Sequence, residues 1–318
     1  MPSIPAVRLT GLLNAASVLA CMATLAGCAG QLWWMLDLAG HFRVQYVLVL
    51  GFGALLALIQ RHHRWAAVFA GFALLNSVLL MPRILPGTAA VASADDPVFR
   101  VLLANINSGH RDPVAIHRAI LHQDPDFILL LEMTPWMLEQ LGDLAGRYPY
   151  RVAEPREDNF GMALFSRRPF LRTERLAFGS AAWPSILAEF AVGERRLILL
   201  GAHPPPPINA ELAQDRNEQL AWLAQRARQT DRPLLLLGDL NLSPWSPWFR
   251  QLLVDSGLQD SADGRGIQPT WPVGWPPLWI PIDHALFSEG IQIQRRTVGA
   301  DLGSDHYPVL VEFRVARR

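Results

Sequence analysis

Residues 233–241, Pro-Leu-Leu-Leu-Leu-Gly-Asp-Leu-Asn, place Asp239 and Asn241 directly after an apolar run that is typical of a buried strand. Further along, residues 304–308 read Ser-Asp-His-Tyr-Pro. Carboxylates, an amide and a histidine at strand ends are the groups that metal-assisted attack on a phosphate ester needs. The two segments together therefore predict an enzyme site at one rim of a sheet.

The composition narrows the class of protein. The 318 residues are 51% hydrophobic and 18% charged, which is more apolar than an average soluble protein, and the excess lies in the first third. The formal net charge is zero, which disfavours a protein that neutralises many nucleic-acid phosphates. No lysine occurs, so Schiff-base chemistry and a P-loop lysine are excluded. Cys21 and Cys28 are the only cysteines, which excludes a disulfide framework after the first third.

Three long apolar segments, residues 11–36, 44–59 and 65–80, open the chain. A transmembrane helix needs roughly 20 apolar residues, and three such segments with so few charges favour membrane spans over buried core helices. Trp33 and Trp34 are expected to close the first span at the headgroup level.

The arginines predict the orientation of these spans. Residues 61–64, Arg-His-His-Arg, form the most basic short loop, and Arg8 precedes the first span, so both are expected on the cytoplasmic side. The loop at residues 37–43 and everything after the third span then lie outside. Arg83, just beyond the third span, favours the opposite orientation. We expect a multi-pass protein of the inner (cytoplasmic) membrane whose catalytic domain is periplasmic.

Residues 25–28, Leu-Ala-Gly-Cys, leave an alternative open, because they resemble the cleavage box of bacterial lipoproteins. Cleavage there would leave Cys28 as a lipidated amino terminus followed by two spans, with the globular part still outside. The many small residues of this segment are equally explained by close helix packing.

The rest of the chain predicts a layered α/β domain. Residues 1–85 are predicted to form the membrane domain and residues 98–318 the catalytic domain. Residues 86–97 contain mostly small and polar residues together with proline and glycine, which predicts a linker between them. Strands are expected at residues 99–106, 127–131, 162–166, 186–191, 197–202, 234–237, 282–287 and 308–313, and helices at 113–122, 134–146, 210–228 and 246–256. Their irregular interleaving predicts a mixed, largely antiparallel fold.

The motifs of this domain resemble the endonuclease/exonuclease/phosphatase superfamily of divalent-metal phosphoesterases and nucleases. The resemblance covers about residues 98–313 in order, through ANIN, LLLEM, GMALFSRRP, GAHPPPP, GDLNLSP, PTW, PIDHALFS and SDHYPVLVEF. It implies a four-layer α/β sandwich of two packed mixed sheets flanked by helices. With three spans ahead of it, the chain looks like the membrane-anchored bacterial branch.

The resemblance implies a site for Mg²⁺, or Mn²⁺ in its place. Glu132 would be the principal metal ligand, Asn105 would assist it through the metal or the phosphate, and Asp305 would lie close to the metal. These are the hard oxygen donors that Mg²⁺ accepts. Taken alone, a glutamate or an asparagine at a strand end is also an ordinary surface or turn residue.

The resemblance also implies the catalytic residues. Asp239 and Asn241, which an extended segment would point to one side, would orient the attacking water and stabilise the transition state. Asp283 would fix the tautomer of His306, and that pair would act as general base or stabilise the transition state. His203 would protonate the leaving oxygen or bind a phosphoryl oxygen.

For three other residues inside the motifs, a functional role and a structural role are both open. Asn159 could reach the site, whereas Trp271 and Ser166 fit a structural role equally well. The other seven histidines, such as His284, are assigned no function, and His284 is expected to point away from Asp283. The tryptophans of the proline-rich loops either contact lipid or simply pack; they are Trp245, Trp275 and Trp279.

The predicted activity is hydrolysis of phosphate mono- or diesters at the membrane surface. Lipid-linked phosphates are the favoured substrate, because a tethered domain meets membrane lipids far more often than chromosomal DNA. A metal-dependent nuclease is the alternative, and nucleic acid is the less favoured partner because of the zero net charge. A non-catalytic membrane module is a third class, but it would be expected to lack one of the metal carboxylates or the histidine.

Overall fold

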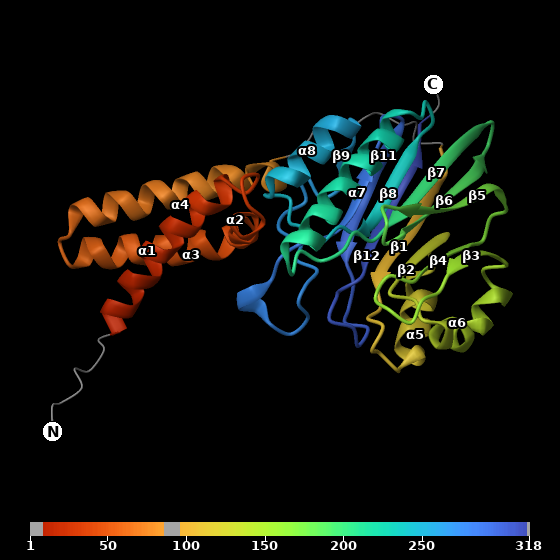
Figure 1. Cartoon of the computed structure of the whole chain (residues 1–318), viewed down its shortest axis with the longest axis horizontal. Coiled ribbons are helices and arrows are strands. Elements are labelled where there is room, and N and C mark those ends of the chain that lie inside the picture. Colours follow the sequence, from red (N-terminus) through yellow and green to blue (C-terminus); the bar gives the residue numbers. More distant parts are fainter. Residues whose placement is uncertain (1–8, 86–95, 317–318) are drawn as a thin grey trace.

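The computed structural model describes residues 9–85 and 96–316. A helical bundle from the amino-terminal part projects from one side of a globular α/β part (Figure 1). Most of the predicted linker at residues 86–97, and Arg8, lie outside the described residues.

The amino-terminal part consists of α1 (Leu9–Cys28), α2 (Trp34–Ala39), the 3₁₀ turn η1 (Gly40–Phe42), α3 (Arg43–Ile59) and α4 (His63–Ile84). The expectation of one helix over residues 11–36 was wrong. The chain leaves the helix after Cys28 and turns, and Gly30 makes this possible, since a Cβ there would lie 2.9 Å from Asp37 Cα. Trp33 and Trp34 therefore start the next helix instead of closing the first.

Three stretches of the described chain are long and apolar enough to cross a membrane: Leu9–Cys28, Trp34–Ile59 and His63–Ile84. Small residues such as Ala54 and Ala57 pack between the helices with Phe69. Large apolar side chains such as Leu12 and Phe52 point outward and are 55% and 67% exposed. Apolar side chains on all faces of a helix are typical of a lipid environment.

The globular part contains two six-stranded sheets with the same pattern of connections. The first has the order β11-β12-β1-β2-β4-β3 and the second β5-β6-β7-β8-β10-β9. In each sheet one pair is parallel, β1 with β2 and β7 with β8, and the other pairs are antiparallel. The strands of the first sheet are Ile291–Val298, Val309–Val315, Val98–Asn105, Phe127–Leu131, Met162–Ser166 and Tyr150–Glu154, in sheet order. Those of the second are Phe170–Phe178, Trp183–Val192, Arg195–Ala202, Leu234–Asp239, Asp283–Phe287 and Gln259–Asp260.

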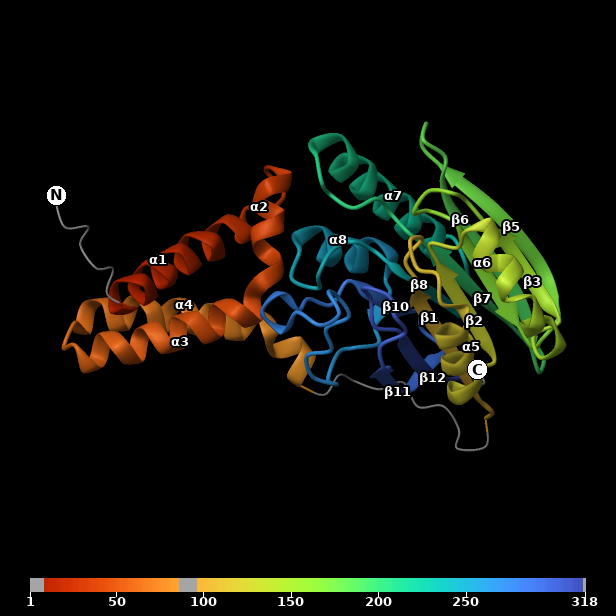
Figure 2. The same ribbon diagram turned by 90° about the horizontal axis from the view of Figure 1, so that it is seen from below.

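Side-chain alternation along the strands builds four layers. Val101 and Leu103 of β1 point into the core between the sheets, whereas Leu102 packs under the helices outside the first sheet. Those helices are α5 (Pro113–Gln123) and α6 (Pro135–Gln140), and α7 (Ala210–Arg228) and α8 (Pro247–Ser256) cover the second sheet (Figure 2). The predicted four-layer sandwich, preceded by three helices able to span a membrane, is confirmed.

Most predicted elements are present, with one helix and four strands in error. The helix expected at residues 134–146 is divided into α6 and the 3₁₀ turn η2 (Gly142–Gly146), because two glycines disfavour a continuous helix there. The strands β3, β5, β9 and β11 were not predicted.

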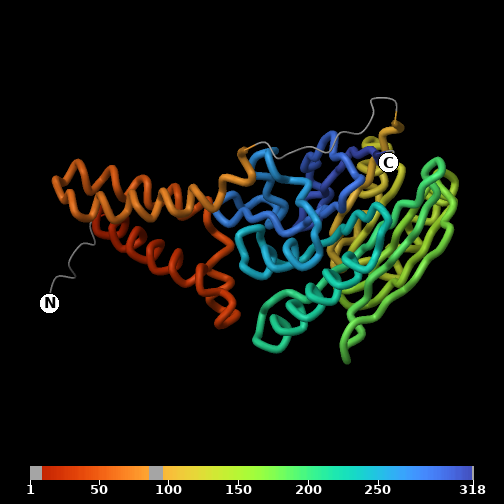
Figure 3. The backbone as a smooth tube through the Cα atoms, turned by 90° about the horizontal axis from the view of Figure 1, so that it is seen from above, coloured from red at the N-terminus to blue at the C-terminus, as the bar shows by residue number. Residues whose placement is uncertain are grey.

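The bundle and the globular part share a buried boundary. Near the end of α4, Arg83 donates to Asp260 at 2.8 Å, and its carbonyl accepts from Gly266 N at 2.6 Å. On the other side, Gln45 of α3 donates to Trp279 O at 2.9 Å. The tube view shows the start of α3 and the end of α4 lying against the carboxyl-terminal third of the chain (Figure 3).

Candidate active site

The strand order brings distant polar residues to one rim. Asn105 ends β1 and Glu132 follows the parallel neighbour β2, while His203 follows β7 and Asp239 ends its parallel neighbour β8. Parallel strands place their carboxyl ends at the same edge, which is where sites collect in α/β sheets. Asp283 opens β10 and is the direct antiparallel partner of Asp239. 

His306 reaches this rim from the segment before β12. It precedes Val309, which is the antiparallel partner of Leu103 in β1. Ser304 holds the segment in place, since its hydroxyl donates to Asn105 O at 2.8 Å and accepts from His306 N at 3.1 Å. The same rim therefore holds residues that are 23 to 201 positions away from His306 along the chain.

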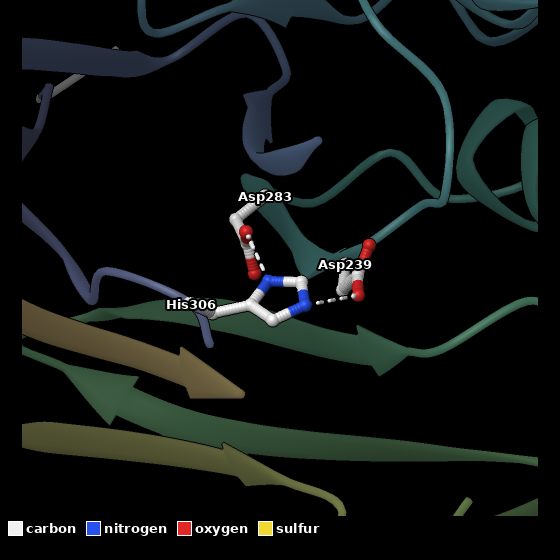
Figure 4. A group of neighbouring side chains, drawn as sticks. All are labelled: Asp239, Asp283 and His306. Atoms are coloured by element: carbon white, nitrogen blue, oxygen red, sulfur yellow. Dashed lines mark hydrogen bonds and ion pairs between the residues drawn. The ribbon is translucent and has the colours of Figure 1, made fainter. Parts of the chain in front are cut away.

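The ring of His306 lies between two carboxylates (Figure 4). Its Nδ1 is 2.9 Å from Asp283 Oδ2, and its Nε2 is 3.6 Å from Asp239 Oδ2. The His203 ring approaches Asp239 from another side, with Nε2 at 3.5 Å from Oδ2. All four side chains are buried, so these interactions act with little screening by water.

The charges of this cluster shift its pKa values. Burial lowers the pKa of His306, but the carboxylates of Asp283 and Asp239 outweigh burial and raise it to about 10. Burial raises the pKa of Asp239, but His306 and His203 outweigh burial and lower it to about 2. Burial likewise lowers the pKa of His203, and the hydrogen bond and charge of Asp239 raise it above its ordinary value. The raised pKa of His306 and the lowered pKa of Asp239 thus favour a cationic ring beside an ionised carboxylate.

Asn105 and Glu132 form the other half of the rim. The Asn105 amide donates to Glu132 Oε1 at 3.0 Å and to Asp239 Oδ2 at 3.2 Å, so a group with positive character stands between two carboxylates. Glu132 has a φ of 60°, a left-handed conformation that costs a non-glycine residue about 1–3 kcal/mol. The following residue Met133 fixes this conformation by donating to Gly161 O at 2.9 Å.

Asp305 joins this half through Asn107, a residue that the sequence analysis missed. Asn107 donates from its amide to Asp305 Oδ1 at 2.7 Å, while the next backbone N–H, of Ser108, donates to Glu132 Oε2 at 2.9 Å. Asn107 is the last residue of the ANIN motif, residues 104–107, and its φ of 57° marks a left-handed turn next to the site.

Two sets of side chains could hold a metal ion at this rim. Asp239, Asp283 and His306 offer ligand atoms within 4.8 Å of one another. Their ring nitrogens and carboxylates are already directed at each other, however, and a histidine ligand must be neutral. Glu132 and Asp305 instead present carboxylate oxygens to the pocket, with Asn105 hydrogen-bonded to Glu132, and such hard donors suit a divalent cation of the magnesium type.

Asn241 reaches the site through a turn and not along an extended strand, which corrects the expectation for the Asp239 and Asn241 pair. Asn241 has a φ of 53°, and its N–H donates to Asp239 Oδ1 at 3.0 Å. The side-chain amide donates to Pro204 O at 2.9 Å. The turn follows a tight strand contact at Gly238, where a Cβ would lie 2.0 Å from Ala202 O.

A cavity of about 570 Å³ opens at this rim. Of the eight residues predicted from the sequence, six line it; of the other two, Asn105 is hydrogen-bonded to Glu132 and Asp239, and Asp283 is hydrogen-bonded to His306. The six are Glu132, His203, Asp239, Asn241, Asp305 and His306. Trp34, Leu38 and His41 from the amino-terminal part line the same cavity, which the sequence analysis did not predict.

The remaining candidates divide between the site and the core. Asn159 and Trp271 line the cavity, and Trp271 Nε1 donates to Asp305 Oδ2 at 3.2 Å. Ser166 is buried and donates to Arg168 O, which is a structural contact. His284 turns away from the site, as expected, and contacts Leu242 O at 2.9 Å.

The tryptophans of the proline-rich loops differ from one another. Trp245 is 4% exposed and packs in the interior, whereas Trp275 is 66% exposed. Trp279 makes an edge contact with Tyr307 at a centroid distance of 6.3 Å, and its carbonyl accepts from Gln45 of the bundle.

Solved structures share this fold at low sequence identity. An endonuclease/exonuclease/phosphatase from Beutenbergia cavernae superposes with a TM-score of 0.56 at 20% identity, over 69% of this chain and 72% of that one. TDP2 from D. rerio, complexed with single strand DNA product, gives 0.57 at 18% identity over 69% and 100%. The human Nocturnin catalytic domain with bound sulfate anion gives 0.56 at 18% identity over 70% and 96%.

Sequence comparison agrees with the fold. A search among curated proteins finds no match. The sequence model of the Endonuclease/Exonuclease/phosphatase family matches residues 102–306, which is more than half of the chain and runs from the middle of β1 to His306. With the strand order and the rim described above, this match shows that the chain belongs to the endonuclease/exonuclease/phosphatase family.

Proposed function

We propose that this protein is a membrane-anchored, divalent-metal-dependent phosphoesterase whose substrate is a lipid-linked phosphate mono- or diester. The observation that carries the proposal is the composition of the cavity at the rim. It combines the acidic and histidine residues of a phosphoesterase with apolar side chains from the membrane part of the chain.

The residues of the rim suit attack of water on a phosphate ester. Asp239 is an ionised carboxylate at the wall of the cavity and would orient the attacking water and accept its proton. His306, held by Asp283, and His203 would neutralise charge that develops on the phosphoryl oxygens, and His203 would donate a proton to the leaving oxygen. The Asn241 amide uses one N–H for Pro204 O, which leaves its other N–H for a phosphoryl oxygen.

Glu132, Asp305 and Asn105 would hold Mg²⁺, or Mn²⁺ in its place. Glu132 and Asp305 line the cavity, and Asn105, which is not among its lining residues, donates from its amide to Glu132 Oε1 at 3.0 Å. A divalent ion bound there supplies positive charge to a phosphoryl oxygen and to the departing oxygen.

The apolar part of the cavity favours a lipid over a nucleic acid. Trp34 and Leu38 come from the stretch Trp34–Ile59 that is able to cross a membrane, and Ile208 and Ile280 continue the apolar surface. A hydrocarbon chain attached to the phosphate could remain in contact with these side chains as it leaves the bilayer. DNA carries no hydrocarbon chain to fill this surface, and the chain carries no net positive charge to attract DNA.

The proposed location is the outer surface of an inner membrane. The arginine-containing loop at residues 61–64 lies at the end of the bundle that is remote from the globular part, and basic short loops favour the cytoplasmic side. The catalytic domain would then face the periplasm.

The test uses the full chain in lipid nanodiscs. Release of inorganic phosphate or headgroup is measured from a polyprenyl phosphate and from phosphatidylglycerol, and plasmid DNA is assayed in parallel, each with Mg²⁺, Mn²⁺ or EDTA. We expect metal-dependent hydrolysis of a lipid substrate that Glu132→Ala and His306→Ala abolish. Cleavage of DNA alone would replace the lipid assignment by a nuclease, and absence of hydrolysis on every substrate would overturn the proposal.

A further inference from the structure

Residues 34–42, comprising α2 and η1, form a docking segment between the membrane helices and the globular part (Figure 2). Asp37 of this segment is 1% exposed although it lies within a stretch able to span a membrane. An ionisable residue in such a stretch is costly unless it is paired, and it commonly marks a functional contact.

Asp37 is paired with a residue of the catalytic domain that is 179 positions away in sequence. Its Oδ2 lies 2.7 Å from Arg216 Nη2 on α7, and its Oδ1 accepts from Ser246 Oγ at 2.7 Å. Arg216 is fully buried, and burial lowers its pKa while Asp37 opposes that shift. Without Asp37 the guanidinium would be left in the interior without its carboxylate partner.

Arg216 extends this contact to the catalytic turn. Its Nη1 donates to Asn241 O at 3.1 Å, and Asn241 in turn donates from its backbone to Asp239. Asn241 holds a left-handed conformation, so an external contact on its carbonyl helps to keep the turn in place. A continuous chain of polar contacts thus runs from Asp37 through Arg216 to Asn241.

His41 makes a second contact with the same loop. Ser243 N donates to His41 Nδ1 at 3.2 Å, and the Ser243 hydroxyl lies 2.9 Å from the same nitrogen. The backbone donor requires an unprotonated Nδ1, so the ring is an acceptor here. His41 also lines the cavity with Trp34 and Leu38, so docking of the segment both fixes the loop and completes the cavity wall.

We infer that residues 34–42 belong to the catalytic site. Within this segment Asp37 is a positioning residue that acts through Arg216 on Asn241. This inference rests on the proposed function. If residues 34–42 belong to the site, the rate of hydrolysis depends on how the membrane helices pack against the catalytic domain. A change in the helical bundle can then regulate turnover.

The test compares variants of the full chain in nanodiscs with bis(p-nitrophenyl) phosphate, a water-soluble diester that does not need the apolar wall. Asp37→Asn and Arg216→Gln are each expected to lower kcat about 10- to 100-fold, the usual effect of removing a group that orients an active-site residue, with little change in KM. The double variant should lose no more than either single variant, because both break the same chain of contacts. Asp37→Glu should recover part of the activity.

Glu189→Gln is the matched control, because Glu189 is a buried carboxylate that bonds Arg196 and Arg232 away from the cavity. Equal kcat for Asp37→Asn and Glu189→Gln, with the wild type active, would overturn the inference and leave the proposed function intact. An inactive wild type would instead overturn the proposed function.

Hydrogen–deuterium exchange supplies a readout that needs no turnover. Asp37→Asn and His41→Ala should speed exchange of the Asn241 and Ser243 amides, because Asp37 is linked to Asn241 through Arg216 and His41 contacts Ser243 directly. Glu189→Gln should leave this exchange unchanged. Unchanged exchange at both amides would contradict positioning by the docking segment, whatever the activity.

Discussion

Asp239 and Asp283 are direct register partners on neighbouring antiparallel strands, and the ring of His306 lies between their carboxylates. Directly opposite like charges destabilise a strand pair unless a cation separates them. The His306 ring fulfils that need, so its position is set by the sheet register as well as by its own loop.

Replacing Asp283 should therefore damage catalysis more than folding. Asp283→Asn removes the negative partner of Nδ1, and we expect kcat to fall about 10²- to 10⁴-fold, the range seen for positioned acid–base groups. Steady-state kinetics on the preferred substrate measure this, with thermal unfolding as the check on folding. Asp255→Asn, an exposed carboxylate on α8, is the control, and a similar loss in that variant would argue against a specific role for Asp283.

Glu132 should control the metal requirement. Glu132→Gln keeps the shape of the side chain but removes its charge, so the Mg²⁺ concentration for half-maximal activity should rise about 10- to 100-fold. A Mg²⁺ titration of initial rates after EDTA treatment measures this. Glu139→Gln on the exposed side of α6 should titrate like the wild type. The same half-maximal Mg²⁺ concentration for the wild type and both variants would show that Glu132 does not bind the metal.

The apolar wall should discriminate between lipid and water-soluble substrates. Leu38→Ala removes apolar surface from the cavity, so KM for a polyprenyl phosphate should rise about tenfold, which corresponds to about 1.4 kcal/mol. KM for bis(p-nitrophenyl) phosphate should stay the same. Trp275→Ala, at an exposed tryptophan outside the cavity, serves as control. A proportional change for both substrates in Leu38→Ala would mean that the wall does not contact a hydrocarbon chain.

Reporter fusions at two positions of the chain, expressed in a bacterial host, test the proposed orientation. Alkaline phosphatase needs disulfides and is active only outside the cytoplasm, so a fusion after Arg318 should be active and a fusion within residues 61–64 inactive. A green fluorescent protein fusion at the same two places should give the reverse pattern. Activity of alkaline phosphatase only in the 61–64 fusion would invert the topology.

Asp260 should make part of the stability depend on pH. Burial raises its pKa, but Arg83 and His284 outweigh burial and hold the pKa well below its ordinary value. A carboxyl group with a lowered pKa in the folded state stabilises the fold above its unfolded pKa of about 4, and this contribution is lost as the pH falls below that value. The difference in Tm between wild type and Asp260→Asn should thus be large at pH 7 and shrink between pH 4 and pH 3. A difference in Tm that does not change with pH would show that the charge of Asp260 is not the cause of the stabilisation.

The four strands that the apolar pattern did not predict are the two edges of each sheet: β11, β3, β5 and β9. An edge strand has one neighbour and meets solvent, so its sequence need not be apolar. In β5, for example, Arg172, Glu174 and Arg175 interrupt the alternation. The central strands Phe127–Leu131 and Met162–Ser166 are buried along their whole length and were predicted with the observed bounds.

The sequence by itself predicted the residues that gather at the rim, because motif spacing and strand ends are local properties of the chain. It also determined that three stretches are apolar enough for a membrane. Only the tertiary structure decided that Trp34, Leu38 and His41 line the cavity and that Asp37 pairs with Arg216 beside it. A buried ion pair between residues 179 positions apart leaves no periodic trace in sequence, since each partner alone resembles an ordinary surface charge, and only folding brings the two together and removes them from water.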